Sequence, residues 1–136
     1  MVLLRTIKVG GKGMKVIYVA GPFRAENAWE IEQNIRRAET LALEVWRAGF
    51  AAICPHTNTR FFQGAAPDEV WLQGDISILN CCDGIIMVPG WETSKGAKAE
   101  EYNAKYNKIP RFYDINELID FDWDQWDDKC EHGYGR

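Results

Sequence analysis

Short apolar segments that alternate with helical patterns are the feature that most limits the folds open to this 136-residue chain. Four such segments, at residues 16–20, 51–54, 84–88 and 109–113, are too short to be ordinary helices. The first three are nearly continuous apolar runs, which are typical of strands buried on both faces of a parallel sheet. Strands of this kind, joined by helices, form α/β domains, and the length of the chain fits one domain.

The segments between these strands predict helices. In the first of them apolar side chains recur every three or four residues, and Gly49 ends the helix: Ile31, Ile35, Ala38, Ala42 and Val45. A second helix is expected from Pro67 to about Asn80, with Val70, Ile76 and Leu79 as its apolar anchors. Helices are also expected at 94–107 and 115–121. Residues 56–66 read as a loop with two exposed aromatic residues.

This alternation predicts the fold class α/β, as a three-layer sandwich with a mostly parallel, Rossmann- or flavodoxin-like sheet of four to five strands. We divide the chain into an N-terminal extension at 1–15, a domain at 16–121 and an acidic, tryptophan-containing tail at 122–136. The tail is either a docked flap or a loose end. Both alternatives fit its acidic residues and its two tryptophans, Trp123 and Trp126.

Charge and composition exclude several classes of partner. From Val16 onward the chain carries a formal charge of −8, with 12 basic residues against all 20 acidic ones. Binding of a nucleic acid polymer needs a basic surface, so it is not expected. The longest apolar runs are far short of the ~20 residues that span a bilayer, and no secretory signal is evident. We therefore expect a cytoplasmic protein with no membrane partner.

Ligands of parallel α/β sheets bind outside the carboxyl ends of the strands. Three predicted loops lie at that edge, at residues 21–24, 55–57 and 90–96. The candidate substrate-binding residues in these loops are Gly21, Pro22, Phe23, Arg24, His56, Trp91, Ser94 and Gly96. The four cysteines form no CxxC pair, and no metal site is expected.

The segment from Ser94 to Glu100 carries the most chemical information. Ser94 fits a helix N-cap and Gly96 allows close approach of a ligand, so this helix start favours an anionic group. Glu100 shares a helix face with Ala97 and Ala104, which predicts a carboxylate on the buried, sheet-facing stripe. The alternative is that Glu100 is simply a surface residue of a charged helix.

Structural alternatives also stand beside the other candidates. Asp75 could be an exposed helical residue, and Asp83 could cap a turn. Tyr18 could be a core aromatic residue. Arg24 could pair with a ligand phosphate or be a solvated charge, and a lone loop histidine such as His56 often has no chemical role.

Several motifs, in the same order along the chain, resemble the nucleoside 2-deoxyribosyltransferase-like superfamily. They are residues 17–22, Asp75 with Asp83, the pattern Ser94-x-Gly96-x-x-x-Glu100, and the closing Lys108-Ile109-Pro110, and together they cover about residues 15–113. The segment from Trp91 to Ala97 looks particularly like an uncharacterised branch of that superfamily, a domain of unknown function.

The resemblance implies roles for individual residues. Glu100 matches the nucleophilic glutamate, Asp75 its acidic partner near the sugar or base, and Tyr18 the tyrosine that positions the nucleophile. In the deoxynucleoside 5′-monophosphate N-glycosidases of the superfamily, the residues matching Arg24, Ser94 and Gly96 hold the phosphate. Two departures are that Pro22 and Phe23 replace a hydroxyl and an aliphatic residue, and that Tyr102 replaces a glycine and could crowd the site.

The expected function is that of an N-glycosidase or 2-deoxyribosyltransferase acting through a glutamate nucleophile on a (deoxy)nucleoside or nucleoside 5′-monophosphate. The alternative is a non-catalytic nucleotide-binding or sensing module. The expected partner is a small-molecule nucleoside or nucleotide, with a phosphate on the ligand and no metal or organic cofactor. A homodimer or larger homo-oligomer is expected because the chain is rich in aromatic residues.

Overall fold

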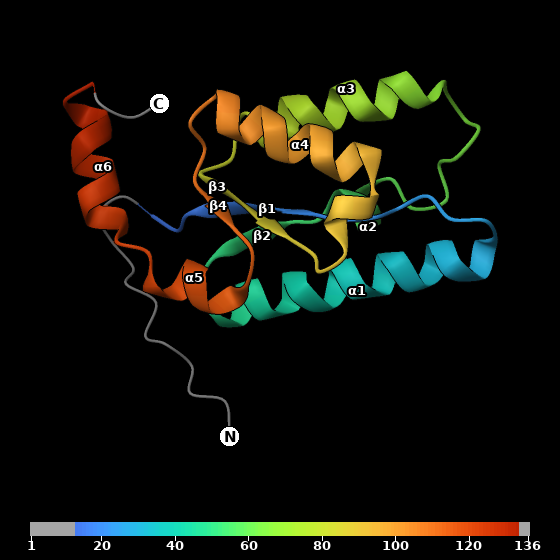
Figure 1. Ribbon diagram of the computed structural model, residues 1–136, viewed down its shortest axis with the longest axis horizontal. Coiled ribbons are helices and arrows are strands. Elements are labelled where there is room, and N and C mark those ends of the chain that lie inside the picture. Colours follow the sequence, from blue (N-terminus) through green and yellow to red (C-terminus); the bar gives the residue numbers. More distant parts are fainter. Residues whose placement is uncertain (1–12, 134–136) are drawn as a thin grey trace.

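Four parallel strands in the order β2-β1-β3-β4 form the central sheet (Figure 1) of this computed structural model, which describes residues 13–133. The strands are β1 (Val16–Ala20), β2 (Ala51–Ile53), β3 (Gly84–Met87) and β4 (Arg111–Phe112). The predicted fold class is confirmed, since this order is that of the first four strands of a flavodoxin-like sheet. Of the predicted extension, residues 1–12 lie outside the described residues.

Helices cover both faces of the sheet and complete the three layers. Figure 1 shows α3 and α4 on one face and α1 and α5 on the other. The helical elements are α1 (Ala28–Arg47), α2 (Pro55–Asn58), α3 (Asp68–Leu79), the 3-10 turn η1 (Trp91–Thr93), α4 (Lys95–Tyr106), α5 (Ile115–Asp120) and α6 (Trp123–Glu131). Within residues 13–133 no helix is long and apolar enough to cross a membrane.

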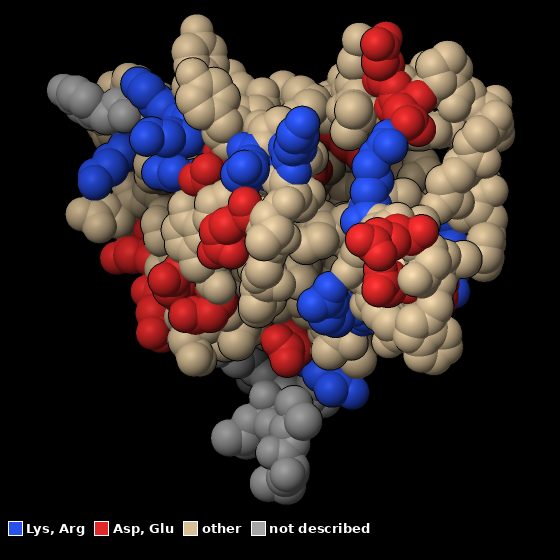
Figure 2. Space-filling view, turned by 45° about the vertical axis from the view of Figure 1, so that its right-hand side comes forward, with Lys and Arg blue, Asp and Glu red and all other residues tan. Residues whose placement is uncertain are grey.

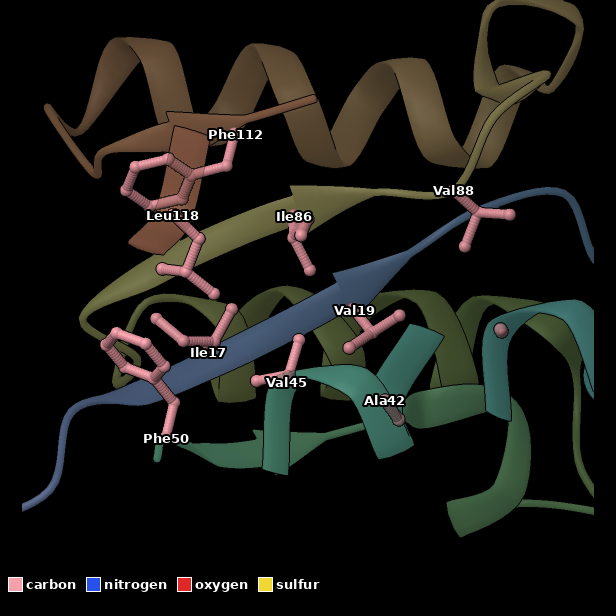
Figure 3. Close-up of a cluster of buried hydrophobic side chains, with 10 residues drawn as sticks. Ile17, Val19, Ala42, Val45, Phe50, Ile86, Val88, Phe112 and Leu118 are labelled. Atoms are coloured by element: carbon pink, nitrogen blue, oxygen red, sulfur yellow. The ribbon is translucent and has the colours of Figure 1, made fainter. Parts of the chain in front are cut away.

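Alternation along β1 divides the core between these two faces. Ile17 and Val19 point toward α1 and α5, where they join the cluster of buried side chains drawn in Figure 3. Tyr18 and Ala20 point the other way and pack with residues of α3 and α4. All four side chains are fully buried. Tyr18 is therefore part of the core, and its position directs its hydroxyl toward the α3–α4 layer.

The helix α1 follows its predicted pattern, with one difference that bears on the site. The Asn27 side chain caps the helix by accepting a hydrogen bond from the Glu30 amide at 2.9 Å, and Gly49 follows its end with a φ of +96°. Ile35, Ala38, Ala42 and Val45 are buried as expected. Ile31, near the start of the helix, is only half-buried and lines a cavity.

The region from residue 56 to the end of α3 departs from the prediction in several places. Residues predicted as loop begin with the short helix α2, and Pro67 is the N-cap of α3 rather than its first residue. Leu79 anchors α3 in the core, but Val70 does not, since 51% of it is exposed. The half of α3 that carries Val70 extends past the sheet edge, so no core residues cover it.

The C-terminal segment forms the helix α6, which was not predicted. The Trp123 ring packs against Phe50, Phe112 and Phe121, with ring centroids 4.7–6.3 Å apart. Lys15 donates a hydrogen bond to Asp127 at 2.6 Å and lies over the Trp123 ring. These contacts fit a docked segment and not a loose end. The division into domain and tail remains a prediction.

Candidate active site

A cavity of about 900 Å³ lies at the carboxyl ends of β1 and β3, where the strand order of the sheet reverses. Of the predicted site residues, those lining it are Gly21, Pro22, Phe23, Arg24, His56, Asp75, Ser94, Gly96 and Glu100. Figure 2 shows acidic and basic side chains gathered around a hollow on one face of the molecule. The cavity therefore lies at the sheet edge where the sequence predicted the candidate loops.

Glu100 reaches the wall of this cavity because α4 turns its small residues toward the sheet. Ala97 and Ala104 are almost fully buried on the same helix face, as the sequence pattern predicted. Glu100 itself is half-buried, and Tyr18 donates a hydrogen bond from its hydroxyl to the Glu100 Oε2 atom. Tyr18 lies beneath the cavity wall and does not line it. The alternative that Glu100 is an ordinary surface residue is wrong.

The neighbouring Glu101 has a structural role instead. It accepts hydrogen bonds from Arg111 at 2.6 Å and from the Tyr113 hydroxyl at 3.1 Å. Asp83 is also structural, because its carboxylate accepts from the Val16 amide at 2.7 Å at the start of β1. Glu101 and Asp83 are thus engaged in structural contacts, whereas Glu100 lines the cavity.

Burial raises the pKa of both carboxyl groups in the cavity. The pKa of Glu100 rises to about 7, although the hydrogen bond from Tyr18 lowers it, while the nearby negative charge of Asp75 adds to the rise. Burial raises the pKa of Asp75 to about 6. The pKa of Tyr18 is also raised, first by burial and then by the charges of Glu100 and Asp75, so its hydroxyl remains a hydrogen-bond donor. Near neutral pH each of the two carboxyl groups is therefore partly protonated.

These shifts predict a pH dependence of stability. Because both pKa values are higher in the folded state, their contribution is fully present below about pH 4 and is lost as the pH rises through about 6 and 7. The free energy of unfolding of Glu100→Gln should therefore rise relative to that of the wild type as the pH increases, by on the order of 2–3 kcal/mol between pH 4.5 and pH 8. Urea unfolding at each pH measures this difference. A constant difference across that range would contradict the prediction, and Glu92→Gln, at an exposed position, is the control.

The start of α4 has the predicted cap. The Ser94 hydroxyl accepts a hydrogen bond from the Ala97 amide at 3.2 Å. A Cβ atom added at Gly96 would meet nothing closer than Ser94 Oγ at 3.9 Å. The glycine therefore leaves open space in the cavity wall, and a ligand group can approach the backbone there.

Two buried polar residues hold the loop that follows β1. His56 donates from Nε2 to the Pro22 carbonyl at 2.9 Å, and Asn34 donates from Nδ2 to the Phe23 carbonyl at 3.1 Å. Burial lowers the pKa of His56, so the neutral imidazole is the form that holds the loop. His56 lines the cavity as expected, and its Nε2 atom is occupied by the loop.

The importance of Asn34 was missed by sequence reasoning. A signal was present, since Asn34 lies four residues before Ala38 on the apolar stripe of α1, where a buried amide needs partners. Arg37 also donates a hydrogen bond to the Asn34 side chain. The Asn34 side chain therefore connects α1 to the loop after β1 through a hydrogen bond.

Arg24 has a partner that the sequence did not suggest. Its guanidinium forms an ion pair with Asp68, the first residue of α3, and both residues line the cavity. The two side chains are largely exposed, at 72% and 55%. Arg24 is thus held at the mouth of the cavity by a carboxylate from the opposite wall.

Two aromatic residues lie elsewhere than expected. Trp91, a predicted substrate-binding residue, does not line the cavity, because its ring packs against Tyr113 with centroids 5.9 Å apart. The possibility that Tyr102 crowds the site is excluded, because 67% of it is exposed and it is not part of the cavity wall. Its place on the outer face of α4 leaves the space near Glu100 open. Among residues 13–133 no cluster of three potential metal ligands is found.

The match to a known protein family covers the four strands and the cavity residues described above. A family model described as a domain of unknown function, DUF4406, matches residues 15–113. No curated protein matches the chain. Among solved structures, it is similar to a 2-deoxyribosyltransferase from Bacillus psychrosaccharolyticus, with a TM-score of 0.47 and 15% identity, over 81% of this chain and 94% of that one. The bacterial protein is presented as a biocatalyst for the synthesis of antiviral and antitumoral nucleosides.

Proposed function

The chain belongs to the DUF4406 family, and from that premise we propose that it cleaves the N-glycosidic bond of a (deoxy)nucleoside or a nucleoside 5′-monophosphate, with Glu100 as the nucleophile. The observation that carries the proposal is the hydrogen bond from the buried Tyr18 to Glu100, in the wall of a cavity that Asp75 also lines. A fixed carboxylate beside a second carboxyl group suits glycosidic chemistry through a covalent intermediate. The sequence motifs support the same assignment of roles.

The first step forms one bond and breaks another. The ionised Glu100 attacks the anomeric carbon, and the electron pair of the C–N bond passes to the leaving base. Asp75, whose raised pKa keeps part of it protonated near neutral pH, gives the base its proton. Tyr18 holds Oε2 and lowers the pKa of Glu100, which leaves Oε1 to attack and increases the ionised fraction.

The second step releases the sugar. Water attacks the anomeric carbon of the glycosyl ester, the electron pair returns to the Glu100 carboxylate, and the proton lost by water passes to Asp75. If a second nucleobase attacks in place of water, the product is a new nucleoside. The cavity of about 900 Å³ has room for either acceptor, so both hydrolysis and transfer belong to the proposal.

A non-catalytic sensing module is the second candidate function. Burial raises the pKa of Glu100 to about 7, so a large fraction of this side chain is protonated at neutral pH and is then no nucleophile. A neutral carboxylic acid can still donate a hydrogen bond to a bound nucleoside. This observation favours binding without turnover.

Base release distinguishes the two functions. The full chain is incubated with the four common 2′-deoxynucleosides, their ribonucleoside counterparts and the 5′-monophosphates of both, and products are separated by chromatography. A free base with a free sugar indicates hydrolysis, and a new nucleoside formed when a second base is added indicates transfer. Binding of these compounds by calorimetry without any base release would contradict the enzymatic function and support the sensor.

The expected homo-oligomer and the cytoplasmic location remain predictions. Several large apolar side chains are exposed beside the cavity, on the loop before α3 and on its first half: Phe61, Phe62, Val70 and Leu72. Association of two copies through this surface would bury it. Sedimentation measures the size of the assembly.

A further inference from the structure

Asp68 forms an ion pair with Arg24, the residue to which the family resemblance gives a role in phosphate binding. It is the first residue of α3, and it pairs with Arg24 of the loop after β1. Both side chains line the cavity. Any anionic group that approaches Arg24 from the cavity therefore meets the Asp68 carboxylate as well.

The backbone that carries Arg24 is fixed. His56 and Asn34, which are both buried, hold the carbonyl groups of Pro22 and Phe23, the two residues just before Arg24. Pro22 has no amide hydrogen, so this loop provides one fewer donor for an oxyanion. These hydrogen bonds therefore hold the backbone just before Arg24, and the ion pair with Asp68 holds its guanidinium.

The charges on the cavity wall do not favour a phosphate dianion. The lining residues include two cationic side chains, Arg24 and Lys95, against three acidic ones, Asp68, Asp75 and Glu100. Because Asp68 already pairs with Arg24, Lys95 is the remaining cationic side chain among the lining residues. A dianion at Arg24 has to displace Asp68 or lie beside it, and either costs Coulomb energy.

Uncharged groups find a different environment in the same cavity. Ile31, Trp71 and Leu72 line it with apolar surface, and the absence of a side chain at Gly96 leaves room for a ligand group. A nucleoside, with its flat base and neutral sugar, fits such a wall.

We infer that Asp68 is a specificity-determining residue, which makes this cavity prefer a nucleoside to the corresponding 5′-monophosphate. The inference rests on the proposed function and reverses the expectation from the sequence that the ligand carries a phosphate. Asp68 acts by occupying Arg24 and by repelling the phosphate dianion.

Calorimetry in the Glu100→Gln background tests this without turnover. The probes are the 2′-deoxynucleosides and their 5′-monophosphates, measured at low salt on the full chain. Adding Asp68→Asn is expected to raise affinity for the monophosphates about 10-fold and to change affinity for the nucleosides less than about 2-fold. Glu69→Gln removes a negative charge from the next residue, which lies outside the cavity wall. It should change the ratio of monophosphate affinity to nucleoside affinity less than about 2-fold. Adding Arg24→Ala to Asp68→Asn should abolish most of the gain.

The outcomes separate this inference from the proposed function. If the background protein binds the monophosphates as tightly as the nucleosides, or if Asp68→Asn shifts their ratio no more than Glu69→Gln does, the inference is overturned while the proposed function stands. If neither probe binds to any variant, the proposed function fails and the inference fails with it. A gain that Arg24→Ala removes supports the inference.

Discussion

Glu100→Gln is expected to lower the rate of base release at least about 1,000-fold, the largest effect of any single substitution in this site. Glutamine keeps the shape of the side chain and can still accept the hydrogen bond from Tyr18. It carries no charge, however, and cannot form the covalent ester with the sugar. The rate is measured with the best substrate of the base-release panel at saturating concentration.

The matched control is the same substitution at the adjacent residue. Glu101 pairs with Arg111 and Tyr113 and does not line the cavity, so Glu101→Gln should keep the rate within a few-fold of the wild type. Circular dichroism of both variants verifies that they are folded. A Glu100→Gln protein with more than a tenth of the wild-type rate would rule out the nucleophilic role.

Gly21→Ala is expected to destabilise the protein by about 3 kcal/mol or more, which corresponds to a fall in Tm of about 10 °C. A Cβ atom at this position would lie 2.6 Å from the Cβ and 2.7 Å from the Cγ2 of Val88, which is buried. Neither backbone can move freely, because the Val88 amide donates to the Ala20 carbonyl at 2.7 Å. Thermal and urea unfolding measure the loss.

A double-mutant cycle identifies the cause of that loss. Val88→Gly removes the atoms that the new Cβ would meet, so Gly21→Ala should cost little in that background. Gly74→Ala is the control, because this helical glycine has nothing within 4 Å of an added Cβ and the change should stabilise by roughly 0.5–1 kcal/mol. Equal losses from Gly21→Ala with and without Val88 would show that the close approach is not the reason for this glycine.

The elements that could be predicted are those in which the apolar residues of the sequence pattern are the residues buried in the core. The strand at residues 16–20 was predicted correctly because its continuous apolar run is buried on both faces of the sheet. The helix ending before Gly49 was predicted correctly because every third or fourth residue meets the core. Helix α6 could not be predicted. Its acidic sequence has no local reason to dock, and its position depends on Trp123 meeting Phe50 and Phe112 from distant parts of the chain.

The same distinction applies to the site. Tyr18, Asp75 and Glu100 meet because parallel topology brings one strand and two helices to the same sheet edge, which the element order alone implies. The pair of Arg24 and Asp68 could not be foreseen, since 44 residues separate them and only the direction of α3 brings them together. Trp91 was misplaced for a similar reason, as its ring found Tyr113 as a partner.

The docked C-terminal segment makes the cooperative folding unit of this chain longer than the unit its family shares. The family match ends at residue 113, yet Leu118 belongs to the buried core and the Trp123 ring packs against it. A fragment that ended at residue 113 would leave Phe50 and Phe112 open to water and would favour aggregation. Because the cavity lies at the carboxyl end of the same sheet, residues far from Glu100 help to hold β1, the strand that carries its partner Tyr18.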